Sequence, residues 1–197
     1  MITEDFYIIN SKKYTSQESV SFNISMKEFY PFFEKYLNKG DKIIDIGFGS
    51  GRDSKYFSSK YKVTSIDVIP DFIQHGKEIG LKDVKLERIE NIEYKNCFNG
   101  IWACASLLHL NDETLIKAID KIITSSKNNC IFYTSFKYGN SENIIEGRYF
   151  NNMDEFKFKR LFNRRELSIL DILITEDKLN RGNNWFNAYL LIKPILN

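Results

Sequence analysis

Glycines and carboxylates around one short apolar run are the residues of this chain with the clearest chemical potential. Asp45 lies in the run Ile43–Ile46, and the glycine-rich turn Gly47-Phe48-Gly49-Ser50-Gly51 follows it directly. A run of β-branched apolar residues is typical of a buried strand. Glycines allow backbone angles, and a closeness to a ligand, that a Cβ would prevent. A strand, a glycine-rich turn and a helix in succession build the nucleotide-type sites of open α/β sheets.

The charges around this turn indicate what it binds. Asp45 precedes the glycines, and Asp53 lies in the first turn of the expected helix, after Arg52. Carboxylates at these places would repel the diphosphate of a dinucleotide, but they suit the ammonium and sulfonium groups of S-adenosylmethionine (SAM). Asp67 ends the next strand-like run, twenty residues after Gly47. Because an acidic side chain at about this spacing accepts hydrogen bonds from ribose hydroxyls, the sequence predicts a SAM site rather than a nicotinamide site.

The glycine-rich segment resembles the first motif of the class I SAM-dependent methyltransferases, and Asp67 resembles their ribose-binding acid. The similarity extends to small bacterial methyltransferases described as tellurite-resistance-like, and it spans nearly the whole chain. Phe48 departs from that pattern, which has a small residue or Cys there, and its ring could crowd the methionine end of the cofactor. The matching segments are Phe6-Tyr7 with Asn10 and Tyr14, Ile44–Ser54, Gly100–His109, Tyr133–Lys137, Gly147–Phe150 and Trp185–Asn187.

The resemblance implies a set of cofactor contacts. Glu90 would meet the adenine amino group, or it is only one charge of the polar stretch 87–95. The segment 103–106 would line the path between the sulfonium and the acceptor. This segment lacks the Asn/Asp-Pro-Pro-Tyr signature of enzymes that methylate the exocyclic amines of bases. The expected cofactor-binding residues are Tyr14, Asp45, Gly47, Phe48, Gly49, Gly51, Arg52, Asp53, Asp67, Val68, Ile89, Glu90, Ala105 and Ser106.

Catalysis places few demands on side chains. Methyl transfer from a sulfonium is an in-line displacement, so positioning of the acceptor contributes most of the catalysis, and a base is needed only when the acceptor must lose a proton. His109 could be that base, or it could be a packed, hydrogen-bonded side chain. The family pattern favours a site role for Tyr14, whereas ordinary aromatic packing is the better interpretation of Tyr7. We expect His109, Tyr14 and Arg148 to act in catalysis.

The segment 136–165 lacks a regular pattern and combines turn-forming, aromatic, basic and amide residues. A loop of this length in a compact domain is usually functional or disordered. It follows the carboxyl end of an expected strand, which is the edge where ligands bind. We expect a lid or substrate-recognition segment in which Glu146, Arg148, Tyr149 and Phe150 matter most. The alternative is an ordered surface excursion with Tyr149 and Phe150 packed into the core.

Apolar periodicity predicts alternating helices and strands. One helix is expected over 26–37, with Pro31 in its first turn or at a kink. Sequential strand–helix units imply a parallel sheet with right-handed crossovers. The predicted fold class is α/β: one domain, 1–197, with a Rossmann-like, seven-stranded, mostly parallel sheet, helices on both faces, an antiparallel last strand and an N-terminal helical cap over 1–40. Further helices are expected over 51–59, 71–80 and 111–124, and strands over 42–47, 62–67, 84–88, 100–105, 129–135, 168–175 and 185–193.

The composition indicates which kinds of binding partner and which cellular compartment to expect. A net charge of +2 over 197 residues gives no global field that attracts nucleic acid or anionic lipid. The apolar runs are too short to cross a bilayer, and three scattered cysteines predict a reducing, cytoplasmic setting. With two histidines and no ligand-like spacing, no metal site is expected. We expect a monomer or a homodimer.

The favoured function is methyl transfer from SAM to a small molecule or a metalloid oxyanion. The second hypothesis is a methyltransferase that modifies RNA (tRNA) or protein, because a cluster of basic residues could contact phosphate. Such a run is more often a solvated helical face. The third hypothesis is a catalytically silent SAM-binding module. The basic residues are Lys157, Lys159, Arg160, Arg164 and Arg165.

Overall fold

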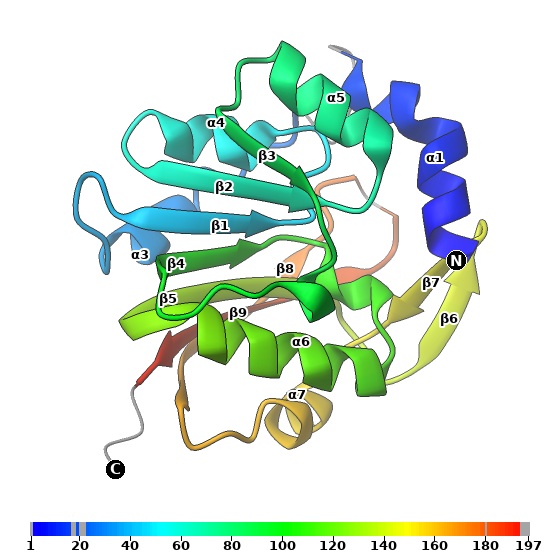
Figure 1. The fold of residues 1–197 in the computed structure, drawn as a ribbon. Helices are drawn as coiled ribbons and strands as arrows, with labels where there is room; N and C mark the ends of the chain where they lie inside the picture. The colour runs from blue at the N-terminus through cyan, green and yellow to red at the C-terminus, as the bar shows by residue number, and fades with distance from the viewer. Residues whose placement is uncertain (1, 17–18, 20–22, 180, 194–197) are drawn as a thin grey trace.

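The main sheet has seven strands: β1 (Lys42–Ile46), β2 (Lys62–Asp67), β3 (Asp83–Leu86), β4 (Phe98–Ala103), β5 (Ser126–Lys137), β8 (Leu167–Glu176) and β9 (Asn184–Ile192). Their order is β3-β2-β1-β4-β5-β9-β8, with helices on both faces (Figure 1). β9 runs antiparallel to β5 and β8, and the other pairings are parallel. This computed structural model, which describes residues 2–16, 19, 23–179 and 181–193, confirms the predicted fold class, including the antiparallel last strand.

The helices are α1 (Ile2–Thr15), α3 (Tyr30–Glu34), α4 (Arg52–Ser58), α5 (Pro70–Glu78), α6 (Asp112–Ser125), α7 (Glu155–Leu161) and the 3-10 helices η1 (Ile89–Asn91) and η2 (Leu107–His109). The helix expected over 26–37 is confined to α3. Pro31 lies in the first turn of α3, where its missing N–H costs no hydrogen bond, and it therefore sets where the helix begins.

Alternate residues of the central strands pack on opposite faces of the sheet. In β5, Phe132 and Phe136 face the side covered by α6 and α7, whereas Ile131 and Tyr133 face the side covered by α3 and α4. All four side chains are 0% exposed. Parallel strands that are covered on both faces have continuous apolar sequences because every side chain is buried. This explains why the strands could be located from their apolar runs.

A buried carboxylate organises the face of the sheet under α3 and α4. Asp53 is 6% exposed and accepts hydrogen bonds from the Tyr30 hydroxyl at 2.6 Å and the Trp102 indole N–H at 2.8 Å. The Arg52 guanidinium meets both carboxylate oxygens, at 2.6 and 2.7 Å. Although burial raises it, the pKa of Asp53 is lowered overall by the Arg52 charge and these hydrogen bonds. Its charge is neutralised inside the protein, which corrects the expectation that Asp53 offers a free charge to a ligand.

The segment after β5, expected to be irregular, contains a β-hairpin and α7. β6 (Glu142–Ile145) and β7 (Arg148–Asn151) pair antiparallel. The two residues between them, Glu146 and Gly147, have φ values of +51° and +76°, as a type I′ turn requires. The Asn-Gly pair that such turns prefer is absent, so the hairpin had no strong local signal. Phe150 packs into the core with 4% exposure, as the alternative interpretation predicted.

The Asp53 network predicts a large effect on stability. Asp53→Ala would remove from the core the acceptor that Tyr30, Trp102 and Arg52 share. Breaking one side of a buried ion pair typically costs about 3–5 kcal/mol, so we expect a loss of this order in the free energy of unfolding, measured by urea titration. The control, Glu113→Ala, removes one partner of an exposed ion pair on α6 and should change stability far less. Equal stability of Asp53→Ala and the unmodified protein would contradict this role.

Candidate active site

The ends of β1 and β4 meet at the glycine-rich turn. Gly47, with a φ of +69°, donates its N–H to the carbonyl of Ile66 in β2. A Cβ on Gly47 would lie 2.5 Å from the Cβ of Ser106, closer than side chains approach. Any other residue at Gly47 would therefore push the two loops apart. By contrast, a Cβ on Gly49 would meet only the carbonyl oxygen of Gly47, at 4.0 Å, so the turn is open on that side.

Asp67, at the carboxyl end of β2, supports this turn. Its carboxylate accepts hydrogen bonds from the backbone N–H groups of Gly49 and Ile69, both at 3.0 Å. Burial raises the pKa of Asp67 to about 6, although the backbone hydrogen bonds act to lower it, so the carboxylate is mostly ionised near neutral pH. A carboxylate offers about four acceptor positions. The positions that the backbone leaves unused can therefore accept from a ligand.

Asp45 is less charged than its place in the sequence suggested. It is 2% exposed and accepts a hydrogen bond from the Ser54 hydroxyl at 2.6 Å. Burial, and then the charge of Asp53, raise the pKa of Asp45 to about 8, so this carboxyl group is largely protonated near neutral pH. Asp53 is itself paired with Arg52. Of the three acids predicted to favour a cationic ligand, Asp67 is the one that keeps an uncompensated negative charge at the turn.

The bulky Phe48 is accommodated by a glycine on the neighbouring helix. Its side chain is 6% exposed and packs against α5, where a Cβ on Gly76 would lie 3.0 Å from the ring. Gly51 also serves packing, because a Cβ there would lie 2.5 Å from Cδ1 of Ile79. Part of the glycine pattern is thus explained by contacts within the protein.

The loop after β4 has two features that fit a polar ligand. Ala105 has a φ of +51°, which is rare outside glycine, and donates its N–H to the Ser135 hydroxyl at 2.9 Å. Backbone strain of this kind concentrates at functional sites. The Oγ atom of Ser106 is buried and has no hydrogen-bond partner among the described residues. Together with the open side of Gly49 and the unused acceptor positions of Asp67, this hydroxyl makes the edge suitable for a SAM-type cofactor.

The predicted adenine and ribose contacts divide between the core and the surface. Val68 lies at the margin of the Phe48 cluster, and Ile89 is 6% exposed in the main core. The Glu90 side chain is 19% exposed, and its carboxylate lies 3.6 Å from the guanidinium of Arg88. Glu90 lies in η1, shortly after the carboxyl end of β3. Its contact with adenine stays a prediction.

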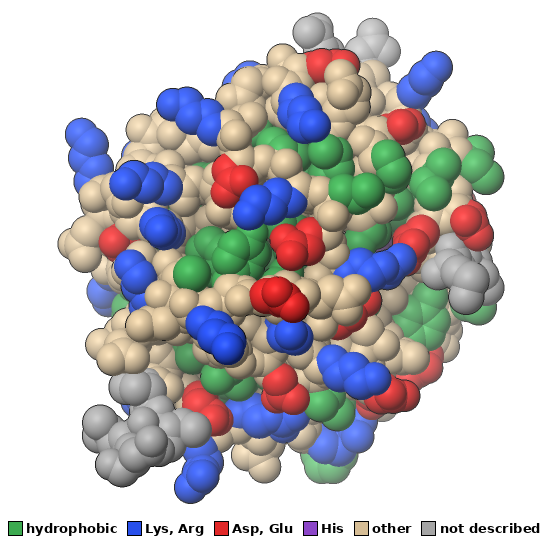
Figure 2. Space-filling view, viewed as in Figure 1, with side chains coloured by type: hydrophobic (Ala, Val, Ile, Leu, Met, Phe, Trp, Pro, Cys, Tyr) green, Lys and Arg blue, Asp and Glu red, His purple; other side chains and the backbone are tan. Residues whose placement is uncertain are grey.

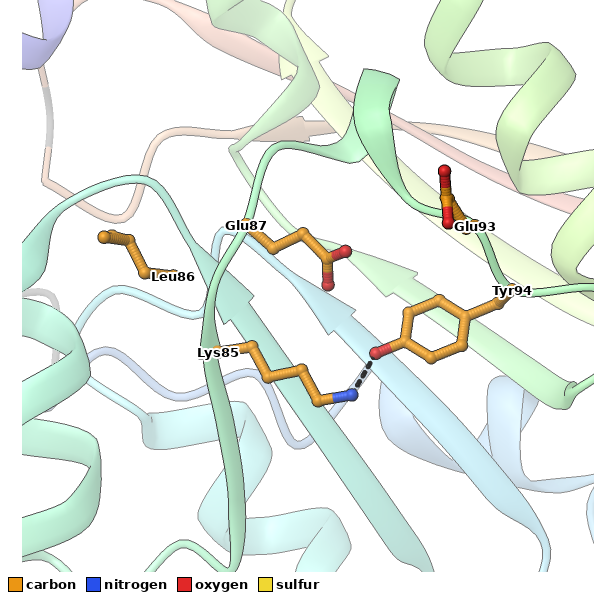
Figure 3. Close-up of a pocket in the computed structure, with 5 residues that line it drawn as sticks. All are labelled: Lys85, Leu86, Glu87, Glu93 and Tyr94. Carbon is orange, nitrogen blue, oxygen red and sulfur yellow. Dashed lines mark hydrogen bonds between the residues drawn. The ribbon is translucent and has the colours of Figure 1, made fainter.

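A separate depression lies beside β3 and the η1 segment (Figure 3). It has a volume of about 460 Å³ and is open to solvent. Lys85 donates a hydrogen bond to the Tyr94 hydroxyl across it. The glycine-rich turn does not line this depression, so it is distinct from the predicted cofactor site. Its lining residues are Lys85, Leu86, Glu87, Glu93 and Tyr94.

Helix α1 covers the carboxyl edge of the sheet, next to the β6–β7 hairpin (Figure 1). One helical face carries polar and aromatic side chains at the i, i+4 and i+7 spacing, and these bond to the elements around the edge. The sequence predicts a helical cap over 1–40, which is the part of the chain that contains α1. The contacts are Tyr149 N–H to Thr3 Oγ1 (2.8 Å), Glu4 with Arg88 (2.6 Å), Tyr7 with His109 (3.1 Å), Ser11 with Asp71 (2.5 Å) and Arg148 with the Tyr14 hydroxyl (3.4 Å).

His109 is half-buried, and both of its ring nitrogens are engaged. Nδ1 lies 2.7 Å from the carbonyl oxygen of Tyr149 and must carry the hydrogen, so Nε2 accepts from the Tyr7 hydroxyl at 3.1 Å. Burial lowers the pKa of His109 to about 4; the Tyr149 hydrogen bond opposes this, and the charges of Arg148 and Lys137 add to it. The ring is therefore neutral near neutral pH, with its basic nitrogen covered by Tyr7. The packed, hydrogen-bonded interpretation describes this arrangement, and the base role stays a prediction.

The Arg148 guanidinium lies between α1 and the β6–β7 hairpin. Its Nη1 is 3.4 Å from the Tyr14 hydroxyl, its Nη2 donates to Glu146 at 2.7 Å, and its buried Nε has no partner among the described residues. The rings of Tyr7 and Tyr14 pack edge to face, with centroids 5.2 Å apart. The structure thus gathers Tyr14, His109 and Arg148 into one cluster. It also adds Tyr7, which the sequence alone assigned to packing.

The basic residues of α7 and the following turn are largely ion-paired. Lys157 is 7% exposed and lies 3.6 Å from Asp112, which also pairs with Arg160 at 2.9 Å. Arg164 pairs with Asp120 at 3.2 Å. Figure 2 shows acidic and basic side chains interspersed over the face that carries α6, rather than a patch of one sign. The cluster that suggested a nucleic-acid partner is thus mostly neutralised within the protein.

The described residues also bear on membrane-spanning helices and on metal sites. None of the helices in the ranges 2–16, 23–179 and 181–193 is long and apolar enough to span a membrane. Over the same residues, no group of three or more His, Cys, Asp and Glu side chains is placed to hold a metal ion.

Residues 44–133 match the model of a protein family described as a methyltransferase domain. The match begins in β1 and ends in β5, so it contains the glycine-rich turn, Asp67 and the loop after β4. The search of curated proteins gives no match.

Several solved structures have the same fold. The 1,6-didemethyltoxoflavin-N1-methyltransferase of Burkholderia thailandensis, solved with 1,6-didemethyltoxoflavin and S-adenosylhomocysteine, superimposes with a TM-score of 0.79 at 14% identity, over 98% of this chain and 88% of its own. The N-methyltransferase NodS of Bradyrhizobium japonicum, solved with S-adenosylhomocysteine, superimposes with a TM-score of 0.72 at 12% sequence identity. The superposition covers 95% of this chain and 98% of NodS. The [4+2]-cyclase SpnF superimposes with a TM-score of 0.73 at 13% sequence identity, over 96% of this chain and 94% of its own. At these identities the similarity shows the fold alone.

The sheet order, the crossover at the glycine-rich turn and the family match together define a methyltransferase of the α/β class. Residues 44–133 thus match a methyltransferase domain, in a chain that has the fold of SAM-dependent methyltransferases. The narrower similarity to tellurite-resistance-like enzymes is not tested by these comparisons and stays a prediction.

The half-buried His109 predicts a loss of stability in acid. Its pKa in the folded protein, about 4, lies below the ordinary value of 6.5. The unfolded chain therefore takes up a proton at His109 at a higher pH than the folded protein does, and stability falls as the pH drops from 6.5 toward 4. Between about pH 7.5 and pH 4.5, this group should remove roughly 2–3 kcal/mol from the free energy of unfolding.

Urea unfolding at both pH values measures this component. His109→Gln should lack it, so the stability difference between the unmodified protein and this variant should shrink in acid. Other buried acids titrate in both proteins and cancel in the comparison. The matched control is His75→Gln, which changes the other histidine and should keep the full pH dependence. If the difference in free energy of unfolding between the unmodified protein and His109→Gln is the same at both pH values, then His109 is not held neutral by burial.

Proposed function

We propose that the protein transfers the methyl group of SAM to a small-molecule acceptor that binds between α1, η2 and the β6–β7 hairpin. The observation that carries this proposal is the convergence of Tyr14 of α1 with His109 and Arg148, at the edge that also holds Ser106. These residues come from separate elements and meet next to the strand ends, where open α/β sheets bind ligands.

The cofactor would be held by the glycine-rich turn and the ends of the neighbouring strands. Asp67 has acceptor positions for the ribose hydroxyls, and the open side of Gly49 lets the ligand approach the backbone. The unpartnered hydroxyl of Ser106 faces the same turn and can bond to a polar group of the cofactor. Glu90 is the candidate for the adenine amino group.

SAM, when bound, supplies a methyl group on a positively charged sulfur atom. The residues of this chain position the acceptor and exclude water, which is where most of the rate acceleration of such a displacement arises. His109 is neutral and can accept a proton at Nε2 from an acceptor that must lose one. Because the Tyr7 hydroxyl occupies Nε2, the proton would pass through that hydroxyl or reach His109 after Tyr7 moves.

The cover favours a small acceptor over a macromolecule. Side chains along α1 bond to β7, α5, η2 and the Arg88 segment, so a bulky substrate would have to displace the helix. The neutralised basic residues on α7 also remove the main reason to expect RNA. The same fold occurs in SpnF, a [4+2]-cyclase, so the fold by itself does not define the reaction.

Thermal stabilisation by SAM, S-adenosylhomocysteine and NAD, measured in parallel, tests the cofactor assignment. A ligand that prefers the native state raises its melting temperature, so SAM and S-adenosylhomocysteine should do so and NAD should not. Formation of S-adenosylhomocysteine is then measured with a library of small acceptors and, separately, with tRNA. Turnover with small acceptors supports the proposal. Turnover with tRNA alone, or cofactor binding without turnover on any acceptor, would overturn it.

Asp67→Asn should weaken SAM binding while it keeps the shape of the side chain. The variant loses the ionised acceptor for the ribose, which typically costs about 1–3 kcal/mol, or roughly 5- to 150-fold in the dissociation constant by calorimetry. In the unmodified protein, affinity should fall as the pH drops below about 6, since protonation of Asp67 removes that acceptor. This pH dependence should be absent in Asp67→Asn.

Asp83→Asn is the matched control. Asp83 is at the beginning of β3, at the opposite end of the sheet from the cofactor edge, and its side chain accepts a hydrogen bond from Thr64 at 2.7 Å. This variant should bind SAM as the unmodified protein does. If Asp67→Asn also binds SAM with unchanged affinity, then Asp67 does not contact the ribose.

A further inference from the structure

We propose that Lys137 and Arg148 form a binding site for a carboxylate, and that the methyl acceptor is a small organic acid held there by its carboxylate group. The proposal names the substrate class of the site proposed above and rests on that assignment. Lys137 ends β5 and Arg148 begins β7, so the two cations come from different parts of the fold.

The two cations share one buried ring. The Lys137 Nζ lies 4.1 Å from the centroid of the Phe150 ring, and the Arg148 Cζ lies 5.4 Å from the same centroid. Phe150 is 4% exposed, so the ring is a fixed platform. Like charges this close repel each other, and burial together with Arg181 and Arg148 lowers the pKa of Lys137. An anion beside this ring would be attracted by both charges.

The protein supplies little counter-charge for this pair. Within the part of the chain that the structure describes, Lys137 has no carboxylate within ion-pair distance. The carboxylate partner of Arg148 is Glu146, whose side chain is 71% exposed. Arg181 differs, because Asp177 holds it through two hydrogen bonds of 2.6 and 3.1 Å. Lys137 is thus without an ion pair among the described residues, and Arg148 is paired only with an exposed carboxylate.

The position of the pair connects it to the transfer site. The rings of Phe150 and His109 have centroids 5.1 Å apart, and the Arg148 guanidinium is 3.4 Å from the Tyr14 hydroxyl. The Nε of Arg148 is buried and has no partner among the described residues. An anion between Lys137 and Arg148 would accept this N–H and would anchor a molecule whose remainder extends toward His109.

The surroundings indicate an organic acid rather than an inorganic oxyanion. A guanidinium presents its N–H groups in a planar fork that matches a carboxylate, and Lys adds a point charge. Aromatic residues contact the pair: the Phe150 ring lies near both cations, the Phe6 ring centroid is 4.6 Å from the Arg148 Cζ, and the Tyr14 hydroxyl is 3.4 Å from Arg148. Rings offer dispersion and apolar contact to a hydrocarbon or aromatic body, which a small hydrated oxyanion does not have.

Benzoate and benzamide are matched probes, because they have nearly the same shape and differ in charge. Binding to the full-length protein is measured by calorimetry, with and without S-adenosylhomocysteine. We expect benzoate to bind at least tenfold more tightly than benzamide and more weakly as salt increases. Benzoate that binds no more tightly than benzamide would overturn the carboxylate site. Inorganic phosphate that binds as tightly as benzoate would overturn the assignment to an organic acid.

Lys137→Met and Arg148→Met remove each charge and keep an unbranched stem. Each should reduce benzoate affinity at least tenfold and remove the preference over benzamide, with S-adenosylhomocysteine affinity unchanged. Lys137→Gln serves if the methionine variant does not fold, and Lys117→Met, at an exposed position on α6, is the control. Variants that keep full benzoate affinity would refute the site. If the unmodified protein binds benzoate but does not bind S-adenosylhomocysteine, the proposed function is refuted and the carboxylate site is not, because benzoate binding does not require the cofactor.

Discussion

The site depends on one close contact: Gly47, after β1, lies against Ser106, after β4. The two loops can meet because Gly47 has no side chain, since a Cβ there would stand 2.5 Å from that of Ser106. The contact brings the open side of the turn, the Asp67 carboxylate and the buried Ser106 hydroxyl to one edge. The parallel strands make this possible because their carboxyl ends all lie on that edge. The residues expected to hold the cofactor turn take their positions from this junction.

Burial decides the chemistry of the ionisable groups. Asp45 is largely protonated and His109 is neutral near neutral pH, because both are removed from water. Asp53 keeps its charge only because Arg52 pairs with it. The net effect is that Asp67 supplies the negative charge at the cofactor turn. The positive charge of Lys137 and Arg148 lies on the acceptor side, beside His109.

This separation suits a transfer between two different ligands. With the cofactor and the organic-acid acceptor proposed above, the field of the protein would attract the cofactor to the negative side and the acceptor to the positive side. Tyr7 and His109 stand between the two sides and join α1 to η2. The cover and the catalytic cluster are therefore the same set of contacts. Opening of α1 would uncover the cofactor turn, the acceptor site and the His109 nitrogen together.

The sequence by itself determined the features that local physics controls. Buried strands were recognisable from continuous apolar runs, and the glycine-rich turn with Asp67 from spacing, because backbone geometry imposes both. Only the tertiary structure decided which charges remain free, since burial protonates Asp45 and the partner of Lys157 comes from a distant segment. It also decided where α1 lies, how the hairpin with its Glu-Gly turn forms, and that Lys137 and Arg148 share the Phe150 ring. The contacts of α1 join residues far apart in the chain, and the hairpin turn lacks the residue pair that would have marked it, so no local pattern encoded either.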